Sequence, residues 1–388
     1  MLPHISHPMS DLPPEAASTT GNNGCDDVSS RIEQIAQTRL RSLASTIDQE
    51  GYYPLDVLEE LAQAGLFSPL ASRDNPDLVQ AVRGVAAVSR WCGSTGFLVW
   101  CHMACALYLA AAPDASLNTD LLALHLQGAR FGGTALSNPI KAQAGIEKMA
   151  LHATRVAGGY LVDGTLPWVS HIAQGQYCGA VASLGEDRTE QVLFLLRLDT
   201  PGLLFKCPHF SGMEGTSTWG IRLQAHFVPE QDVIATPAAP LLKQIKVPFL
   251  LLQCGMAAGI IQGAIDSMQE VEGPLGHVNQ YLHDRPDTLA SELKTLEERL
   301  TFLARAPAPQ DRGYMLDVLD IRAHGAELAL RATQSALLHQ GARGYLSSAA
   351  PQRRVREAQF MAIVTPAIKH LRYEMDRLSQ DADFSHFV

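Results

Sequence analysis

The spacing of apolar residues divides the chain into three stretches. Between residues 29 and 128, apolar side chains recur at the spacing of one helix face. The run from Thr95 to Ala112 is apolar on all sides, which is typical of a helix at the centre of a bundle. We therefore predict an α-helical domain over residues 29–128. Residues 1–28, rich in Pro, Ser, Thr, Asn and Gly, are predicted to be a disordered tail.

The pattern changes near Phe131. From there to about Ile234, short runs rich in β-branched and aromatic residues are separated by turns such as Ala157-Gly158-Gly159. Amphipathic runs of helical length are missing from this part of the sequence. We predict a β-barrel or β-sandwich domain over residues 129–235.

Helical periodicity returns near residue 241 and continues to the end of the last apolar run. Long helices are predicted over residues 250–271, 288–304, 315–340 and 351–378, which together suggest a four-helix bundle over residues 240–378. In the first of them, Gly255, Gly259 and Gly263 are spaced by four, so we expect another helix to pack closely there. The predicted fold class is thus multidomain α+β, with helical, β and helical-bundle domains in that order.

Composition and charge narrow the functional classes. The formal net charge is −10, which argues against a nucleic-acid partner bound through its phosphates. The seven cysteines contain no CxxC pair, so we expect neither a disulfide framework nor a metal centre, and a reducing compartment. The first residues lack the basic and apolar regions of a signal peptide, and no uninterrupted apolar run is long enough to cross a membrane. These features predict a cytoplasmic protein without a membrane partner.

Four short motifs occur in a characteristic order. They are the segments 51–54 (Gly-Tyr-Tyr-Pro), 134–139 (Thr-Ala-Leu-Ser-Asn-Pro), 159–170 (from Gly-Tyr to Trp-Val-Ser) and 339–345 (His-Gln-Gly-Ala-Arg-Gly-Tyr). Together with the order of helices and strands, they resemble the acyl-CoA dehydrogenase superfamily over about residues 30–375. This resemblance implies a flavin-dependent oxidoreductase with FAD as its cofactor.

The resemblance also implies which residues contact the flavin. Ala135 and Ser137 match the motif that bonds the edge of the ring, while Trp168 and Ser170 match the motif that places a tryptophan and a hydroxyl against it. A buried flavin edge needs such partners, because an unpaired buried polar group costs about 1–3 kcal/mol. The alternative is that Trp168 fills the core of the β domain and Ser170 bonds within its strand.

The adenosine end of the cofactor is expected at a glycine-rich turn. Gly341, Ala342 and Gly344 match the turn that, in the superfamily, reaches across a dimer interface, which implies a homodimer or homotetramer. The glycine-spaced helix is a second argument for subunit contact. An ordinary turn between helices would also contain glycines. Asn279 stands where the superfamily carries an arginine for the pyrophosphate, so FMN or a diffusible reduced flavin remains an alternative to FAD.

The main departure concerns the catalytic base. Ile363 occupies the position of the glutamate that removes the α-proton of the thioester, and the second usual position is apolar Phe249. No acidic residue lies within three positions of either one. Neither side chain can accept a proton. The chain therefore resembles a divergent member that lacks the catalytic glutamate.

Other ionisable residues are candidates for the missing role. His102 lies in the apolar helix that faces the acyl pocket in the superfamily, and His209 and Glu214 lie on a loop near the substrate approach. Each also has a structural interpretation, as a core histidine or as a loop residue. The segment Lys369–Arg372, with His370, could form a basic entrance for a phosphopantetheine or simply a solvated helix face.

These observations predict a specialised enzyme of secondary metabolism. We expect it to oxidise or oxygenate an aromatic or acyl-thioester substrate with flavin and O2. One alternative is a dehydrogenase of acyl-CoA or acyl-carrier-protein thioesters with a relocated base. The other is a non-catalytic scaffold that retains the fold.

Overall fold

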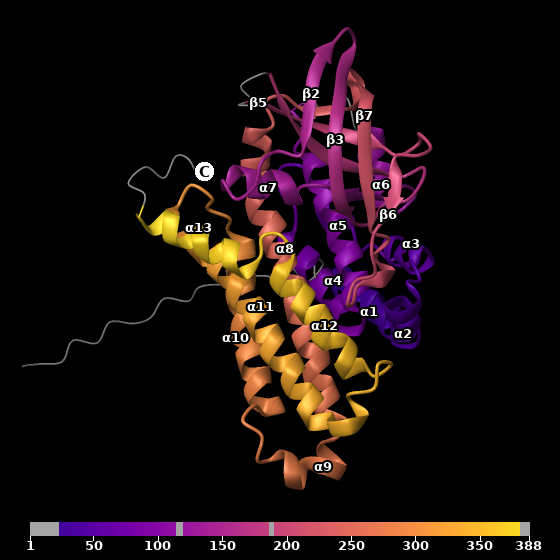
Figure 1. Cartoon of the computed structure of the whole chain (residues 1–388). Coiled ribbons are helices and arrows are strands. Elements are labelled where there is room, and N and C mark those ends of the chain that lie inside the picture. The colour runs from indigo at the N-terminus through magenta and orange to yellow at the C-terminus, as the bar shows by residue number, and fades with distance from the viewer. Residues whose placement is uncertain (1–22, 114–118, 186–189, 381–388) are drawn as a thin grey trace, which may run out of the picture.

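The computed structural model describes residues 23–113, 119–185 and 190–380 (Figure 1). Its helices are α1 (Asn23–Ile35), α2 (Arg41–Glu50), α3 (Leu55–Gln63), α4 (Leu78–Trp91), α5 (Gly93–Ala110), α6 (Thr119–Leu126), α7 (Ser137–Gln143), α8 (Ala239–Gln269), α9 (Glu272–Asn279), α10 (Pro286–Arg305), α11 (Arg312–Gln340), α12 (Ala350–Ile363) and α13 (Ile368–Gln380). Its strands are β1 (Gly132–Thr134), β2 (Leu151–Val156), β3 (Gly159–Val169), β4 (Tyr177–Leu184), β5 (Glu190–Arg197), β6 (Leu204–Lys206), β7 (Trp219–Pro229) and β8 (Val233–Ala235).

The first helix begins earlier than the sequence predicts. α1 starts at Asn23 and continues through a π-helical segment, Ala36–Leu40, into α2. The predicted disordered tail is therefore wrong for residues 23–28, while residues 1–22 lie outside the described part of the chain. Low hydrophobicity suggested a loose segment, but Val28 packs against the main core and holds this part of α1 in place.

The strands form one mixed sheet in the order β6-β7-β3-β2-β4-β5-β8, with β1 paired to β4. β2 and β3 form a hairpin across the predicted glycine turn, where Gly158 has a φ of 77°. The side chains of this sheet form a smaller apolar core, which includes Val162, Ala180 and Phe194. This core is separate from the large core of the helices. The predicted α+β class is thereby confirmed, with the strands between two helical regions.

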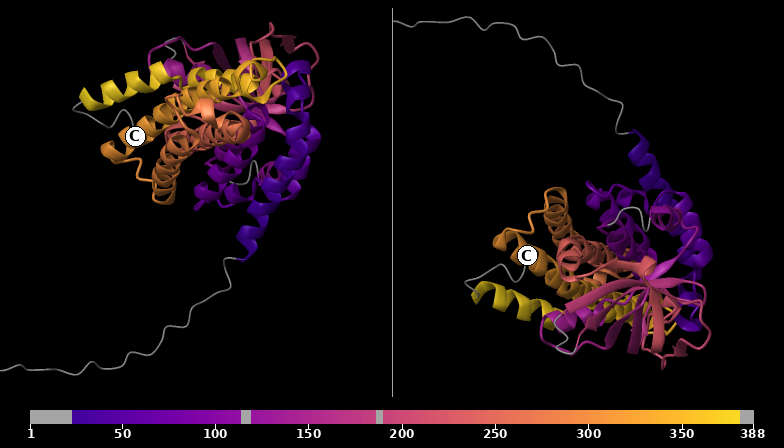
Figure 2. Two further views of the ribbon diagram at one scale, coloured as in Figure 1. Left: turned by 90° about the horizontal axis from the view of Figure 1, so that it is seen from below. Right: turned by 90° about the horizontal axis from the view of Figure 1, so that it is seen from above.

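The C-terminal helices form a bundle below the sheet, with α9 at its far end (Figure 1). Views along the bundle show α1 to α3 on one flank and α13 on the other (Figure 2). The single helix predicted over residues 351–378 is wrong, because α12 ends at Ile363 and α13 begins at Ile368. Pro366 explains the break, since proline lacks the N–H that a helix needs and disfavours helical geometry at the preceding residue.

The glycines of α8 face α4 of the same chain. A Cβ placed on Gly259 would lie 2.3 Å from the carbonyl oxygen of Ala86, and one on Gly263 would lie 2.5 Å from that of Arg90. Close helix packing at these glycines is therefore confirmed. Since α4 occupies this face, the glycines give no support to the predicted subunit contact, which then depends on the resemblance alone.

Two helices, α5 and α8, have the length and apolar composition of membrane spans. Their most apolar windows are 94% and 89% buried inside the folded chain. They are the central helices of the large apolar core, as the all-round apolar pattern predicted for the run from Thr95.

Candidate functional site

The end of strand β3 presents an exposed tryptophan beside a row of hydroxyl groups. The Trp168 side chain is 61% exposed, so the alternative that it fills the β core is wrong. Ser170 Oγ lies 2.6 Å from Thr218 Oγ1, which lies 2.8 Å from Thr216 Oγ1. Trp168 and Val169 alternate across the strand, because successive side chains point to opposite faces. The strand thus buries Val169 and turns the indole outward.

The first β motif lies directly beside the second. Thr134 forms an isolated antiparallel bridge with Ser170. The backbone N–H of Ala135 donates to the Gly179 carbonyl at 2.9 Å, so this N–H is engaged in the protein rather than open to a ligand. Ser137 begins α7, and its exposed Oγ lies 2.7 Å from Thr365 Oγ1. The two motifs and the turn after α12 therefore meet at one place.

Hydrogen bonds from a buried arginine and a glutamine fix the turn between α12 and α13. Arg322 on α11 is fully buried and donates to Gln253 Oε1 at 2.7 Å and to the Met361 carbonyl at 2.9 Å. Gln253 in turn donates to the Thr365 carbonyl at 2.9 Å. Burial lowers the pKa of Arg322 to about 10. With the turn fixed in this way, the Ile363 side chain projects outward and is 70% exposed.

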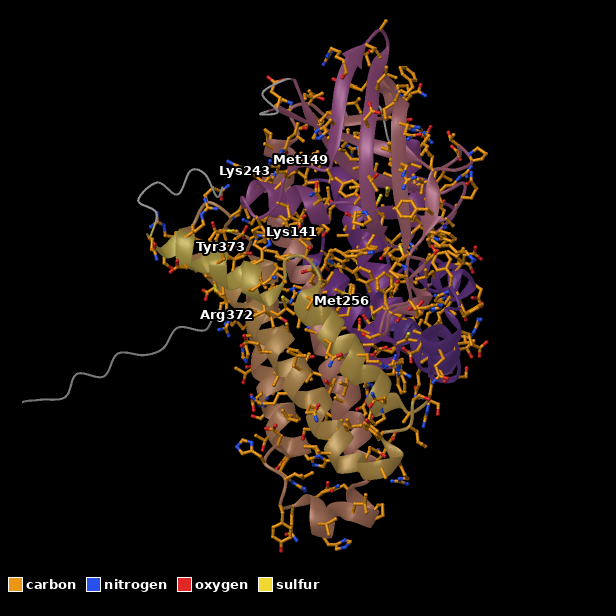
Figure 3. The ribbon with its side chains drawn as sticks, viewed as in Figure 1. Lys141, Met149, Lys243, Met256, Arg372 and Tyr373 are labelled. Atoms are coloured by element: carbon orange, nitrogen blue, oxygen red, sulfur yellow. The ribbon has the colours of Figure 1, made fainter. Side chains whose placement is uncertain are left out.

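A small pocket opens between α7, α8 and α13 on this side of the molecule. Figure 3 marks its surroundings by Lys141 of α7, Lys243 of α8, and Arg372 and Tyr373 of α13. Its volume is about 50 Å³, enough for a few water molecules or a small group. Its lining residues are Leu136, Ile140, Gln143, Leu242, Ile245, Lys246, Phe249, Leu250, Pro366 and Glu374.

The acidic residue of this pocket was missed by the sequence argument. Glu374 is 8% exposed, with Oε1 lying 3.2 Å from His370 Nε2 and Oε2 lying 3.3 Å from Lys246 Nζ. The candidates from the sequence included Glu214 and the neighbours of Ile363 and Phe249, but not Glu374. The spacing of His370 and Glu374 by four on one helix was the available signal, because such pairs share a face.

His102 lies in the protein interior rather than facing a pocket. Its ring stacks on His125 at 3.5 Å, and each ring donates through Nε2 to the backbone carbonyl of the other residue, at 2.9 and 2.8 Å. His171 packs edge-on at 5.5 Å, and its Nδ1 bonds the Tyr53 hydroxyl. Burial lowers the pKa of His125 to about 4 and of His171 to about 3, and places that of His102 well below its ordinary value. This geometry supports the interpretation of His102 as a histidine of the protein core.

The loop candidates contact each other rather than the pocket. Glu214 Oε1 accepts a hydrogen bond from the Phe210 N–H at 2.5 Å, which closes the loop. The His209 side chain is fully exposed, and its Nδ1 lies 3.8 Å from Glu214 Oε2. Neither residue lines the pocket. The structural interpretation of both is therefore the better supported.

The glycine-rich turn lies at the other end of the bundle. Gly341 has a φ of 61°, and Gly341 and Ala342 are exposed, whereas Gly344 is buried. Asn279 is buried and donates to the His339 carbonyl at 3.3 Å, so it ties α9 to the end of α11. The nearby Arg285 is paired with Glu272. Arg285 is therefore already engaged within its own chain.

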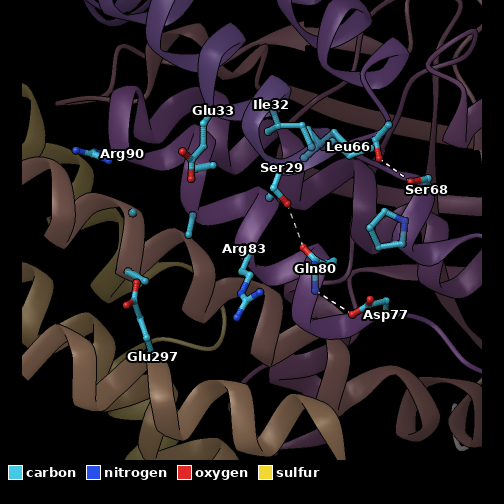
Figure 4. Close-up of a pocket in the computed structure, with 18 of the residues that line it drawn as sticks. Ser29, Ile32, Glu33, Leu66, Ser68, Asp77, Gln80, Arg83, Arg90 and Glu297 are labelled. Carbon is cyan, nitrogen blue, oxygen red and sulfur yellow. Dashed lines mark hydrogen bonds between the residues drawn. The ribbon is translucent and has the colours of Figure 1, made fainter. Parts of the chain in front are cut away.

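A larger groove of about 600 Å³ lies between α1, α4 and α8, away from these motifs (Figure 4). Two hydrogen bonds join polar residues of its lining: Ser29 donates to Gln80 at 3.4 Å, and the Gln80 N–H donates to Asp77 at 3.0 Å. None of its lining residues belongs to the flavin motifs or the turn after α12. We therefore place the functional site at the sheet end of the bundle.

No family model matches the chain. The probable acyl-CoA dehydrogenase YngJ of Bacillus subtilis (strain 168) is 22% identical over 361 residues, covering 86% of this chain and 91% of that protein.

Solved structures share the fold. A glutaryl-coenzyme A dehydrogenase in complex with glutaryl-CoA superposes with a TM-score of 0.82 at 15% identity, covering 94% of this chain and 98% of the other. A dibenzothiophene monooxygenase from Paenibacillus sp. A11-2 gives 0.76 at 15% identity, covering 91% and 97%. The chain thus resembles acyl-CoA dehydrogenases in sequence, and it has the fold that the glutaryl-coenzyme A dehydrogenase and the dibenzothiophene monooxygenase share.

Proposed function

We propose that this protein uses FAD and O2 to oxidise or oxygenate an aromatic or acyl-thioester substrate, in a specialised, secondary-metabolic role in the cytoplasm. The observation that carries the proposal is the exposed, apolar Ile363 at the end of α12, next to the turn whose Thr365 contacts Ser137. The superfamily members that it resembles place a carboxylate there for α-proton removal. The monooxygenase with the same fold offers a precedent for other chemistry on this scaffold.

The residues at the end of β3 fit a flavin ring. Trp168 offers an exposed aromatic surface, and Ser170, Thr218 and Ser137 offer hydroxyls that can donate or accept hydrogen bonds. An exposed indole costs free energy in water, which a stacked ring would recover. When bound there, FAD would supply hydride acceptance and reaction with oxygen, while the protein orients it and excludes water.

A second copy of the chain would complete this site. The hydroxyl cluster at Thr365 and the turn at Gly344 lie at opposite ends of α12, whose 14 residues span about 21 Å. The turn is surrounded by exposed apolar side chains, namely Val278, Tyr281, Leu338, Tyr345 and Leu346. Such a patch fits subunit contact. We therefore propose a homodimer, or a homotetramer built from two dimers, in which the partner's turn holds the adenosine end.

Two alternatives make different demands on the site. A thioester dehydrogenase needs a relocated base, and the buried Glu374 in the pocket is the observation that favours it. A non-catalytic scaffold would not need an exposed tryptophan beside a hydroxyl row. We therefore retain the dehydrogenase as the second candidate and set the scaffold aside.

Anaerobic reduction and aerobic reoxidation of the FAD-loaded protein test the proposal. The flavin spectrum should bleach with an active substrate and recover with O2 consumption, and a panel of CoA thioesters and aromatic compounds gives the substrate class. Purified protein that binds no FAD, or bound flavin that no compound reduces and that O2 does not reoxidise, would contradict it.

A further inference from the structure

The pocket between α7, α8 and α13 adjoins the proposed flavin site on two sides. Leu136, one of its lining residues, stands between Ala135 and Ser137 of the first β motif. Pro366, another, follows Thr365, whose hydroxyl contacts Ser137. A small molecule that enters this pocket therefore lies next to the residues assigned to the flavin.

Two lining residues of this otherwise largely apolar pocket are ionisable, Glu374 and Lys246. Both oxygens of the Glu374 carboxylate have a partner, His370 on one side and Lys246 on the other. The imidazole of His370 is 3% exposed, and its Nδ1 is buried with no hydrogen-bond partner in the described part of the chain. If Nε2–H faces the carboxylate, Nδ1 carries a lone pair that can accept a proton.

The charge on Glu374 is maintained by these neighbours. Burial acts to raise its pKa, but the hydrogen bond with His370 and the charge of Lys246 outweigh burial, so the pKa lies below the ordinary value. Two other charged groups on the packed helices pair elsewhere: Arg372 pairs with Glu327, and Lys141 pairs with Glu147. The carboxylate is thus ionised at neutral pH and buried beside an apolar cavity.

We propose that Glu374 is the acid–base group of this site and that the substrate is an acyl thioester with an acidic α-proton. His370 orients the carboxylate, and Lys246 balances its charge. This inference rests on the proposed function, because it assumes that the pocket receives substrate beside the flavin. It assigns the missing base to α13, far in sequence from both usual positions.

Removal of the α-proton by Glu374 requires no oxidant. The α C–H bond of the thioester breaks, its proton moves to a carboxylate oxygen of Glu374, and the electron pair remains on the substrate as an enolate. Protonation neutralises Glu374, which leaves the Lys246 ammonium to stabilise the new negative charge. Return of the proton reverses the step, so in D2O the α-position exchanges hydrogen for deuterium.

Deuterium exchange into phenylacetyl-CoA, followed by NMR with the FAD-loaded protein under anaerobic conditions, tests this step. Glu374→Gln should lower the exchange rate by at least about 100-fold, the lower bound for a lost general base. Asp376→Asn on the same helix removes an exposed carboxylate that bonds Gln380, and it should leave the rate unchanged. Flavin content and thermal unfolding confirm that each variant is folded.

The pH profile distinguishes a chemical role from a structural one. His370→Gln and Lys246→Met each remove a group that stabilises the charged carboxylate, so the pKa of Glu374 should rise. The acid limb of the exchange rate should therefore move to higher pH in both variants. The proposal is overturned if the acid limb of the exchange rate stays at the same pH in both variants, or if Glu374→Gln exchanges as fast as the unmodified protein. It is also overturned if the unmodified protein gives no exchange above the buffer rate.

The flavin spectrum separates this failure from a failure of the proposed function. If FAD binds and is reoxidised by O2 in a substrate-dependent cycle while Glu374→Gln exchanges normally, only the base assignment is wrong. If the unmodified protein binds no FAD, the proposed function itself fails.

Discussion

Ser137 and Thr365 bring their hydroxyl oxygens to 2.7 Å across 228 positions of the sequence. Ser137 begins α7 next to the sheet, and Thr365 lies in the turn that ends α12. This contact joins the β motifs to the bundle at the place where the superfamily resemblance puts both the flavin and the substrate. Ile363, two positions before Thr365, is thereby held at the edge of the site.

Restoring a carboxylate at this position should create dehydrogenase activity. We expect Ile363→Glu to reduce its flavin with butyryl-CoA faster than the unmodified protein, because it places a carboxylate where the acyl-CoA dehydrogenases that the chain resembles carry the base for the α-proton. Stopped-flow bleaching under anaerobic conditions measures the rate, and Ile363→Gln is the uncharged control. Rapid reduction by the unmodified protein would show that the position of Ile363 does not limit the reaction.

Trp168→Ala should lower flavin occupancy with little effect on folding. The side chain is 61% exposed, so its removal should change the free energy of unfolding by no more than about 0.5 kcal/mol. The ratio of flavin absorbance to protein absorbance and a urea melt give the two quantities. Phe227→Ala, which removes another exposed aromatic from the same sheet, should keep its flavin. Equal occupancy in both variants would disprove the assignment of Trp168.

The buried histidines should make the protein sensitive to mild acid. Their folded-state pKa values, about 4 for His125 and about 3 for His171, lie below the ordinary 6.5, so the unfolded chain binds more protons. Their contribution to stability is present above pH 6.5 and is lost as the pH falls toward these folded values. The free energy of unfolding should decrease by up to about 1.4 kcal/mol per pH unit per histidine.

Urea unfolding between pH 6.5 and 5, where most carboxylates stay ionised, isolates this effect. His171→Asn should reduce the slope, whereas His209→Gln, at a fully exposed position, should not. A stability that does not change over this interval would show that the cluster takes up protons without unfolding.

Close packing of α8 on α4 predicts opposite effects for two glycine substitutions. Gly259→Ala places a methyl group 2.3 Å from the Ala86 carbonyl oxygen and should destabilise the protein by about 1–3 kcal/mol. Gly273→Ala, where a Cβ meets no atom within 4 Å, should stabilise α9 by up to about 1 kcal/mol. Thermal unfolding measures both changes, and a neutral Gly259→Ala would mean that the helices can separate at low cost.

A shared site predicts that subunit contact and flavin binding are lost together. Tyr345→Glu combined with Leu346→Glu places charges on the exposed apolar patch at the glycine-rich turn and should reduce both the mass seen by light scattering and the flavin content. Phe302→Glu, at an exposed aromatic of α10, should keep its flavin. A monomeric unmodified protein with full flavin occupancy would contradict the dimeric site.

Local periodicity was enough to predict most elements of the fold. The helical spacing of α10 appears directly in the sequence, because this helix buries one face at the helical period. The glycine spacing of α8 correctly indicated a close helix neighbour. The break at Pro366 was also visible in the sequence, but the apolar pattern on both sides of it favoured one long helix.

The sequence by itself determined the order of helices and strands, the superfamily resemblance and the lack of a carboxylate next to Ile363 or Phe249. Only the tertiary structure decided that the α4 backbone packs on the glycines of α8. It also decided that Trp168 is exposed and that Glu374 lines the same pocket as Phe249. These outcomes depend on how separate elements pack against each other. Sequence distance says nothing about such contacts, because a bundle folds α13 back against α8 and brings their side chains into one site.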